Sequence, residues 1–241
     1  MKKILALVFL ILFFSGKVYG ADINHCSVAS GDIDGTSSGS PLDNTYTCQD
    51  DQTFVLDEDE YVSGESARIT ASNDNLTINI SGNLLATGNG NVITGTSFDT
   101  VAITNQSTGL IKGTTNGIKF DRGDAGTIDN YGDIYAVSAK TINNTGADNT
   151  QITNRSGAKI RTDGQNAILV QDGTSSNASE TITVDNYGDI TAKYNAIKLA
   201  GSATGVTINN YSGATIEATD TDNDNTNAKA AIRIDVNDVT V

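Results

Sequence analysis

The sequence predicts an all-β chain wound as a parallel β-helix, and three observations support this fold class. Short aliphatic runs have i, i+2 spacing, as in Ile197 and Leu199, which is the periodicity of a strand. Gly, Asn, Asp and Ser separate these runs and favour turns. Related segments recur every 24 to 32 residues, a length that fits one coil of a β-helix. No stretch after residue 20 shows helical periodicity.

An asparagine marks the same position in each repeat. It follows an aliphatic residue by two places and precedes a turn that contains Gly and leads to another aliphatic residue. The five copies are Asn105, Asn130, Asn154, Asn186 and Asn210, with spacings of 25, 24, 32 and 24. We expect these side chains to lie at a corner of the coil, where each bonds turn carbonyls and the Asn of the next coil, as in an amide ladder.

A glycine follows each of the last four of these asparagines in the turn. These glycines are Gly132, Gly157, Gly188 and Gly213. We predict a positive φ at all four, because a side chain would oppose that conformation. The aliphatic residues on either side, such as Ile128 and Ile134, should stack from coil to coil about 4.8 Å apart and bury against the opposite sheets.

The repeats extend from residue 76 to residue 241. A weak copy occupies residues 76–84, and the copy at residues 141–144 is irregular. The extra residues of the longer coils, 171–179 and 217–227, are predicted loops at one corner. Residues 238–241 resemble the opening of another coil, so we expect the sequence to be a fragment that stops within a repeat.

The first 20 residues predict a secretory signal peptide. Met1, Lys2 and Lys3 form a short positive region, residues 4–14 are an unbroken apolar run, and small residues precede Ala21. This apolar run is much shorter than the roughly 20 residues that a membrane-spanning helix needs. No later segment is apolar enough to form such a helix. We therefore expect cleavage before Ala21 and export of the mature chain.

The exported chain is strongly acidic. Removing residues 1–20 leaves 12 Lys and Arg against 29 Asp and Glu, a formal charge of −17 instead of −14. Such a chain repels the phosphates of nucleic acids and anionic lipids. Neither is therefore expected as a partner.

Residues 21–75 differ from the repeats and predict an N-terminal cap, with room for one irregular coil. We predict a disulfide between Cys26 and Cys48, because the exported chain enters an oxidising compartment. Closing such a loop stabilises a fold by roughly 3 kcal/mol in the chain-entropy model. The alternatives are a catalytic thiol or a zinc site, but zinc needs four ligands and His25 is the only His of the chain.

The repeat resembles that of bacterial autotransporter passenger domains. The resemblance rests on Ile-Asp-Asn-Tyr-Gly-Asp-Ile at residues 128–134, on the equivalent residues 184–190 and on Ala-Ile-Lys-Leu at residues 196–199. It covers roughly residues 76–241. It implies a right-handed parallel β-helix that a C-terminal outer-membrane β-barrel carries to the cell surface. The sequence has no segment with the strand pattern of such a barrel, so this translocator is expected in the full-length chain. The alternative is that the barrel is absent and the protein is released or held in another way.

The resemblance also implies a function, since passengers of this family are most often adhesins or other surface-interaction proteins. We expect a non-enzymatic stalk or adhesin at the cell surface, in the outer membrane or outside the cell, with a protein or a glycan as its ligand. Three tyrosines share one repeat position: Tyr131, Tyr187 and Tyr211. They predict a surface ladder, with a sugar-stacking stripe as the alternative.

A carbohydrate-active enzyme, either a polysaccharide lyase or a glycoside hydrolase, is the alternative function. It requires carboxylates, alone or with Arg or Lys, in one groove on adjacent coils. The candidates are Asp121, Arg122 and Asp124, with Arg161 and Asp163 one coil further on. A serine hydrolase is disfavoured, because there is a single His and no Gly-x-Ser-x-Gly segment.

No cofactor and no metal site are expected. Residues 220–226 resemble the start of an EF-hand loop, which leaves weak surface calcium binding as an alternative. However, Asn225 replaces the required Gly, and Ala231 stands where the bidentate Glu is needed. A solvated loop is the simpler interpretation.

Overall fold

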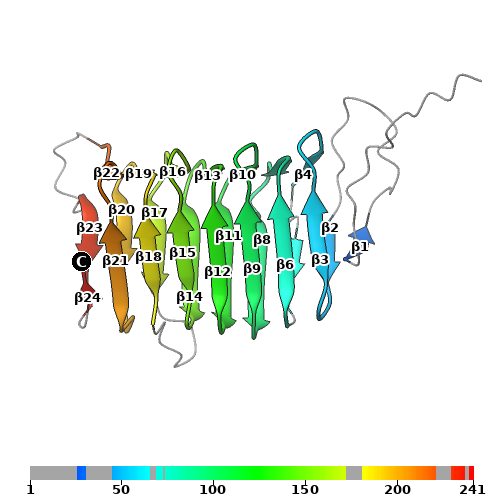
Figure 1. Ribbon diagram of the computed structural model, residues 1–241, viewed down its shortest axis with the longest axis horizontal. Helices are drawn as coiled ribbons and strands as arrows, with labels where there is room; N and C mark the ends of the chain where they lie inside the picture. Colours follow the sequence, from blue (N-terminus) through cyan, green and yellow to red (C-terminus); the bar gives the residue numbers. More distant parts are fainter. Residues whose placement is uncertain are drawn as a thin grey trace, which may run out of the picture.

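The structure is a computed structural model that describes residues 26–30, 45–65, 69–72, 74–171, 181–220, 229–236 and 239–241. These residues form 24 β-strands and no helix. The strands lie side by side along one long axis, which gives a rod (Figure 1). The predicted all-β solenoid is confirmed, with about six turns. The predicted signal peptide and His25 lie outside the described residues.

Three sheets run along the rod, and each turn of the chain contributes one strand to each of them. The nine-stranded sheet contains β1 (Ser27–Ser30), β2 (Thr45–Cys48), β5 (Ile69–Ala71), β8 (Asn91–Phe98), β11 (Asn116–Gly123), β14 (Lys140–Ala147), β17 (Asn166–Gln171), β20 (Asn195–Leu199) and β23 (Ala230–Ile234). The eight-stranded sheet contains β3 (Thr53–Leu56), β6 (Leu76–Ile80), β9 (Val101–Asn105), β12 (Gly126–Asn130), β15 (Gln151–Asn154), β18 (Thr183–Asn186), β21 (Val206–Asn210) and β24 (Val239–Thr240). The seven-stranded sheet contains β4 (Tyr61–Gly64), β7 (Asn83–Ala86), β10 (Leu110–Gly113), β13 (Asp133–Ala136), β16 (Lys159–Thr162), β19 (Asp189–Ala192) and β22 (Thr215–Ala218).

Equivalent residues of successive turns pair in parallel register. In the eight-stranded sheet Ile103 pairs with Ile128, which pairs with Ile152. The register also holds across the longest repeat, where Ile152 pairs with Val184. Because one side of each strand faces the interior, these aliphatic residues stack along the rod and are at most 1 % exposed. The core is therefore a set of parallel aliphatic columns.

Glycines make room for one aromatic pair in this core. The ring centroids of Phe98 and Phe120 lie 5.0 Å apart. A Cβ on Gly95 would lie 2.8 Å from the Phe98 ring, and one on Gly126 would lie 2.8 Å from the Phe120 ring. Contacts this short do not occur for real Cβ atoms, so the large rings require these glycines.

One polar residue lies in the core of the nine-stranded sheet, between two hydrophobic residues of the neighbouring turns. Asn144 pairs with Phe120 on one side and Val170 on the other and is fully buried. Its Nδ2 donates to the carbonyl of Ala147 at 3.0 Å and to Oγ1 of Thr150 at 3.1 Å. Its Oδ1 accepts from the Ala147 N–H at 3.0 Å. The irregular repeat at residues 141–144 is thus part of strand β14, with its buried amide bonded inside its own turn.

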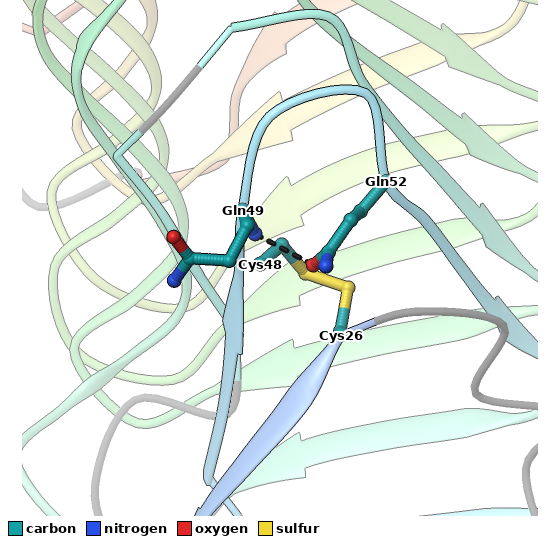
Figure 2. Close-up of a disulfide and its surroundings, with 4 residues drawn as sticks. All are labelled: Cys26, Cys48, Gln49 and Gln52. Carbon is teal, nitrogen blue, oxygen red and sulfur yellow. Dashed lines mark hydrogen bonds between the residues drawn. A yellow bond between two sulfur atoms is a disulfide. The ribbon is translucent and has the colours of Figure 1, made fainter.

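A disulfide holds the N-terminal end of the rod, as predicted. Cys26 and Cys48 are bonded and both are buried (Figure 2). The bond ties the chain before β1 to β2, and these two strands are antiparallel. Beside it the backbone N–H of Gln49 donates to Oε1 of Gln52 at 2.6 Å. The parallel turns begin at β2, so the turn formed by β2, β3 and β4 lies within the region predicted to cap the solenoid.

Two strands extend into segments that were predicted to be loops, and this part of the prediction is wrong. Gln171 is the last residue of β17 and pairs with Thr145. Glu217 belongs to β22 and pairs with Thr191. In both places the backbone stays hydrogen-bonded to the equivalent strand of the preceding turn after the aliphatic pattern has ended. Residues 172–179 and 221–227 of the predicted loops lie outside the described residues.

Candidate functional site

The repeat asparagines form a continuous ladder at the corner between the eight-stranded and seven-stranded sheets. Each of the first four donates from Nδ2 to Oδ1 of the next. The successive distances, from Asn105 through Asn130, Asn154 and Asn186 to Asn210, are 2.8, 2.9, 2.8 and 2.8 Å. The first four residues are fully buried. The ladder therefore joins five turns through side chains as well as through the backbone.

The ladder also bonds the corner carbonyls. Asn130 donates to the carbonyl of Gly132 in its own turn at 3.2 Å and to that of Lys159 in the next turn at 3.1 Å. Asn186 likewise reaches the carbonyl of Thr215 at 2.9 Å. Buried carbonyls without a partner are costly, and the amides remove that cost where the chain changes direction.

The ladder starts at Asn105, whose side-chain oxygen has no neighbouring amide among the described residues to accept from. The preceding turn carries Ile80 at the paired position, so it offers no amide. Oδ1 of Asn105 is buried and has no hydrogen-bond partner within the described chain. The sequence already contained this signal, because the weak repeat at residues 76–84 has an aliphatic residue in place of the Asn.

A second amide ladder, which the sequence analysis missed, lies at the start of the strands of the nine-stranded sheet. Asn116 donates to Asn91 at 2.6 Å, and Asn195 donates to Asn166 at 2.9 Å. Lys140 occupies the same position between these two pairs. The repeated Asn before the Gly-Ile or Ala-Ile pairs was the available signal. Oδ1 of Asn116 and of Asn195 face turns without an amide, and both lack a partner in the described residues.

A row of aspartates follows the corner between the nine-stranded and eight-stranded sheets. The carboxylate of Asp50 accepts the N–H of Asp74 at 3.1 Å, and the carboxylate of Asp74 accepts the N–H of Asp99 at 3.1 Å. Further along, Asp124 accepts from the side chain of Asn149. These acids recur at the repeat spacing, a signal that the sequence analysis did not use. They join successive turns from outside the core.

The prediction of a positive φ is wrong for two of the four corner glycines. Gly132 and Gly188 are not among the glycines with positive φ. A Cβ on Gly132 would lie 2.3 Å from the carbonyl oxygens of both Gln106 and Gly109. A Cβ on Gly188 would lie 2.4 Å from those of Arg155 and Ala158. These glycines are required by close approach to the preceding turn and not by their own backbone conformation.

The other two corner glycines do have positive φ, at +79° for Gly157 and +86° for Gly213. Their corners are two residues longer, and the N–H of Ala158 donates back to the carbonyl of Arg155 at 3.0 Å. This places Gly157 third in a four-residue turn, where a positive φ is required in type II geometry. No atom lies within 4 Å of a Cβ built on Gly157 or Gly213. Corner length therefore decides which role the glycine has.

Three tyrosines and one arginine stack on the outside of the same corner, and we call this set the tyrosine ridge: Tyr131, Arg155, Tyr187 and Tyr211. The Tyr187 and Tyr211 rings are stacked, with centroids 4.0 Å apart and an interplanar angle of 6°. The Arg155 guanidinium lies 5.3 Å from the Tyr131 ring centroid. The tyrosines are 38–41 % exposed. Stacking covers ring faces along the rod axis, so a row of ring edges and hydroxyl groups faces solvent.

The ridge is anchored by carboxylates of the eight-stranded sheet. Arg155 makes two hydrogen bonds to Asp129, at 2.6 and 2.9 Å, and this pairing raises the pKa of the guanidinium further. The hydroxyl of Tyr211 lies 3.3 Å from Oδ1 of Asp185. Hydrogen bonding to Tyr187, followed by burial, raises the pKa of Tyr211 to about 12. The ridge side chains are therefore held in place before any partner arrives.

A second set of paired groups lies on the outer face of the seven-stranded sheet, and we call it the Tyr135 cluster: Lys112, Asp133, Tyr135, Arg161 and Asp163. The ring of Tyr135 lies between the Lys112 ammonium, 5.4 Å from its centroid, and the Arg161 guanidinium at 4.2 Å. Arg161 also bonds the carboxylate of Asp133 at 2.7 Å. The Tyr135 hydroxyl donates to Asp163.

Neighbouring groups of this cluster shift the pKa values of Tyr135 and Arg161. Burial, followed by the hydrogen bond to Asp163, raises the pKa of Tyr135 to about 12. The hydrogen bond to Asp133 raises the pKa of Arg161 above its usual value. At neutral pH the tyrosine is therefore neutral and the arginine is fully charged.

The structure does not bring together the acids and arginines that the enzyme hypothesis grouped. Asp121 and Arg122 lie on β11 of the nine-stranded sheet, whereas Arg161 lies on β16 of the seven-stranded sheet. Asp121 pairs with Lys119 at 3.2 Å. The predicted neighbourhood is wrong, because β16 follows β11 by five strands, which is not a whole number of turns, so the two strands belong to different sheets of the solenoid.

The described residues contain no group of three or more His, Cys, Asp and Glu that could hold a metal ion. Asp220, from the EF-hand-like segment, pairs with Lys229 at 3.1 Å. Over the same described ranges, no helix has the length and hydrophobicity needed to cross a membrane.

Comparisons of the chain with protein-family models, with curated proteins and with solved structures find no match. The features of the chain that bear on function are therefore those of its own geometry: the ladders, the tyrosine ridge and the Tyr135 cluster.

Proposed function

We propose that this chain is an exported, non-enzymatic rod of the autotransporter passenger type, acting as a structural stalk or adhesin at the cell surface. The observation that carries the proposal is the mutual pairing of its outward-facing charged groups. Asp129 is bonded to Arg155, Asp133 to Arg161, and Asp163 to a tyrosine hydroxyl. A general acid or base must be free to reach a substrate, whereas these groups bond across neighbouring turns.

The ladders support the stalk part of the proposal. In a solenoid each turn contacts only its neighbours, so stiffness depends on each interface between turns. Here those interfaces combine parallel backbone pairing, aliphatic columns and buried amide bonds, as between Asn130 and Asn154. Every interface of the corner ladder is therefore reinforced.

The tyrosine ridge supports the adhesive part. Tyrosines offer large, amphipathic contact area and lose little conformational entropy on binding, which is why they are enriched in protein-binding surfaces. Stacking already restrains Tyr187 and Tyr211. Since stacking uses ring faces, the ridge presents edges and hydroxyls, which suits a protein ligand better than face-on stacking of a sugar.

A carbohydrate-active enzyme is the second candidate, and the Tyr135 cluster is the observation that favours it. This cluster places two acids and an arginine on the adjacent strands β13 and β16 and the turn that follows β16. Acids combined with Arg on neighbouring coils are the arrangement that such chemistry needs. It ranks second because both acids are already bonded within the cluster.

An adhesion assay tests the leading proposal. Beads coated with the chain lacking residues 1–20 are placed on cultured epithelial cells and on a protein-coated surface, and attachment is counted. A triple variant of the tyrosine ridge (Y131S, Y187S and Y211S) should lose attachment. Y61S is the matched control, because Tyr61 is 42 % exposed but lies on the seven-stranded sheet. Equal attachment of both variants would remove the ridge from the proposal.

An activity assay tests the alternative. The same protein is incubated with acidic and neutral polysaccharides, and release of unsaturated products or reducing ends is followed. The proposal expects no release. Depolymerisation that disappears in R161A and in D133N, while K119A retains it, would instead establish the enzyme. Lys119 serves as the control because it pairs with Asp121 on another sheet.

A further inference from the structure

Three dipeptides in the described chain have the composition for spontaneous succinimide formation: Asn89-Gly90, Asn116-Gly117 and Asp163-Gly164. In this reaction the backbone nitrogen of the second residue attacks the side-chain Cγ of the first. Glycine favours the attack because it has no Cβ to block the approach and its backbone is the most adaptable. The structure distinguishes the three sites by what holds the attacked side chain and the attacking nitrogen.

Asn116-Gly117 is held on both sides. Asn116 is 6 % exposed, and its Nδ2 donates to Oδ1 of Asn91 at 2.6 Å. Both residues belong to strand β11. A Cβ on Gly117 would lie 2.9 Å from the carbonyl of Thr141, which shows how closely the next turn packs there. The backbone nitrogen cannot reach the Asn116 side chain unless the strand separates.

Asp163-Gly164 is held in a different way. The N–H of Gly164 donates to Oγ1 of Thr162 at 2.9 Å, so the attacking nitrogen is engaged. The Asp163 carboxylate accepts the hydroxyl of Tyr135. A Cβ on Gly164 would also lie 2.2 Å from the backbone of Ser138. This turn has no room for the rotation that ring closure requires.

Asn89-Gly90 lacks these restraints. It lies in the bend between β7 and β8, and Asn89 is exposed. In the described chain neither its side-chain amide nor the N–H of Gly90 has a hydrogen bond. The backbone carbonyl of Asn89 accepts a hydrogen bond from the Thr115 hydroxyl, with 3.0 Å between the two oxygens. Within the described chain, no hydrogen bond therefore restrains this side chain from rotating toward the following nitrogen.

We infer that Asn89 is a site of spontaneous deamidation in the folded rod. The Gly90 nitrogen loses its proton to solvent base and bonds to Cγ of Asn89, and the Cγ–Nδ2 bond breaks with release of ammonia. Water then opens the resulting ring at either carbonyl, which leaves aspartate or isoaspartate at position 89. Either product adds a negative charge, and isoaspartate also adds one atom to the backbone just before β8.

The modification would act on a defined part of the fold. Between residues 21 and 111 the sequence has a single Lys or Arg, Arg68, so the new carboxylate joins an already acidic end of the chain. The lengthened backbone would shift the carbonyl that Thr115 bonds. It would also displace Asn91, the first residue of the second amide ladder.

Peptide mapping by mass spectrometry tests the inference. The full chain is kept folded in mildly alkaline buffer, and a second sample is kept in the same buffer with urea. In the folded sample deamidation at Asn89 should be at least about tenfold faster than at Asn116, because a buried strand must open before it reacts. In urea the two rates should converge. Equal rates in the folded sample would overturn the inference, as would a folded chain that stays unmodified at Asn89.

Two variants serve as controls. N89Q removes the side chain that closes a five-membered ring, so the signal at this position should disappear. G90A retains the asparagine but adds a Cβ beside the attacking nitrogen, so it should slow the reaction in both samples. If G90A deamidated at the original rate, direct hydrolysis would replace the cyclic route and the inference would be rejected.

Discussion

Asn154 donates a hydrogen bond of 2.8 Å to Asn186 across a turn in which 32 residues separate the two side chains. Asn186 donates to Asn210 over the same distance although only 24 residues separate that pair. The additional residues of the longer turn therefore leave the ladder bond unchanged. The bond is also kept although the corner that follows Asn154 is longer than the corner that follows Asn186.

Replacing Asn154 with alanine should destabilise the rod strongly. The change leaves buried amide groups of Asn130 and Asn186 without their hydrogen-bond partner, so we expect the free energy of unfolding to fall by about 2–4 kcal/mol. Urea denaturation followed by circular dichroism measures this loss. N210A is the matched control, because Asn210 is exposed and has a ladder bond on one side only. Similar losses in the two variants would contradict a stabilising role for the buried ladder.

Replacing Lys140 with asparagine should stabilise the fold. The new amide would lie between Asn116 and Asn166, where it could donate to the unpartnered Oδ1 of Asn116. We expect a gain of about 1 kcal/mol in the free energy of unfolding. K140A removes the same lysine without supplying an amide and should show no gain. A gain in K140A alone would show that the lysine itself is unfavourable and would refute the ladder explanation.

Gly132 and Gly157 should respond differently to asparagine. G132N places a Cβ against two carbonyl oxygens and should cost about 3 kcal/mol or more, since neither backbone can easily move. G157N faces open space and needs only a positive φ, which asparagine tolerates, so the loss should stay within about 1 kcal/mol. Thermal unfolding of both variants measures the difference. Equal losses would mean that backbone conformation and not steric contact governs both positions.

Tyr135 should make the rod less stable at high pH. The pKa of Tyr135 is raised to about 12 from its ordinary value of 10.0, so the folded state holds this proton more tightly than the unfolded state does. The resulting stabilisation is fully present below pH 10 and is lost as the pH rises toward 12. Unfolding measured across that range should show a smaller decline in Y135F than in the original chain. An identical decline would assign the effect to other groups.

Loss of the disulfide should loosen the N-terminal end first. The bond joins residues 22 positions apart, and its removal in a C26S, C48S double variant should cost about 3 kcal/mol in the chain-entropy model. Hydrogen exchange should show lost protection in β2 while β12 keeps its protection, because each turn depends mainly on its neighbours. The original chain treated with reductant is the control. Uniform loss of protection along the rod would show that the turns unfold as one unit.

The periodic parts of the fold could be predicted because they depend on local alternation and on repetition. The pairing of Ile128 with Ile152 follows from a repeated aliphatic position in a strand, and the ladder from Asn130 to Asn154 follows from a repeated polar one. The disulfide could be predicted from the presence of two cysteines in a chain whose first 20 residues predict export. The first two predictions need the repeat spacing, the third needs only the cysteine count and the expected export, and none needs knowledge of the path between repeats.

The sheet assignment of single residues could not be predicted in the same way. Arg161 follows Asp121 by 40 positions, more than one repeat and less than two, so the two residues lie on different sheets of the solenoid. The second amide ladder was missed because Lys140 interrupts it, which hides its period from a search for regular spacing. The tyrosine ridge could be predicted as a shared position, which Arg155 occupies after Asn154, whereas the pairing of Arg155 with Asp129 could not.

The sequence by itself determined the all-β class, the length of the repeat, the columns of aliphatic residues and the position of the corner asparagines, because these follow from side-chain alternation and identical spacing. Only the tertiary structure decided why each corner glycine is required, which acids pair with which arginines, and which asparagine is free to react. Those properties depend on the distance between atoms of successive turns. Gly132 shows the difference. Its sequence context predicts a turn with positive φ, but its φ is not positive. No side chain fits there because a Cβ atom would lie 2.3 Å from two carbonyl oxygens of the preceding turn.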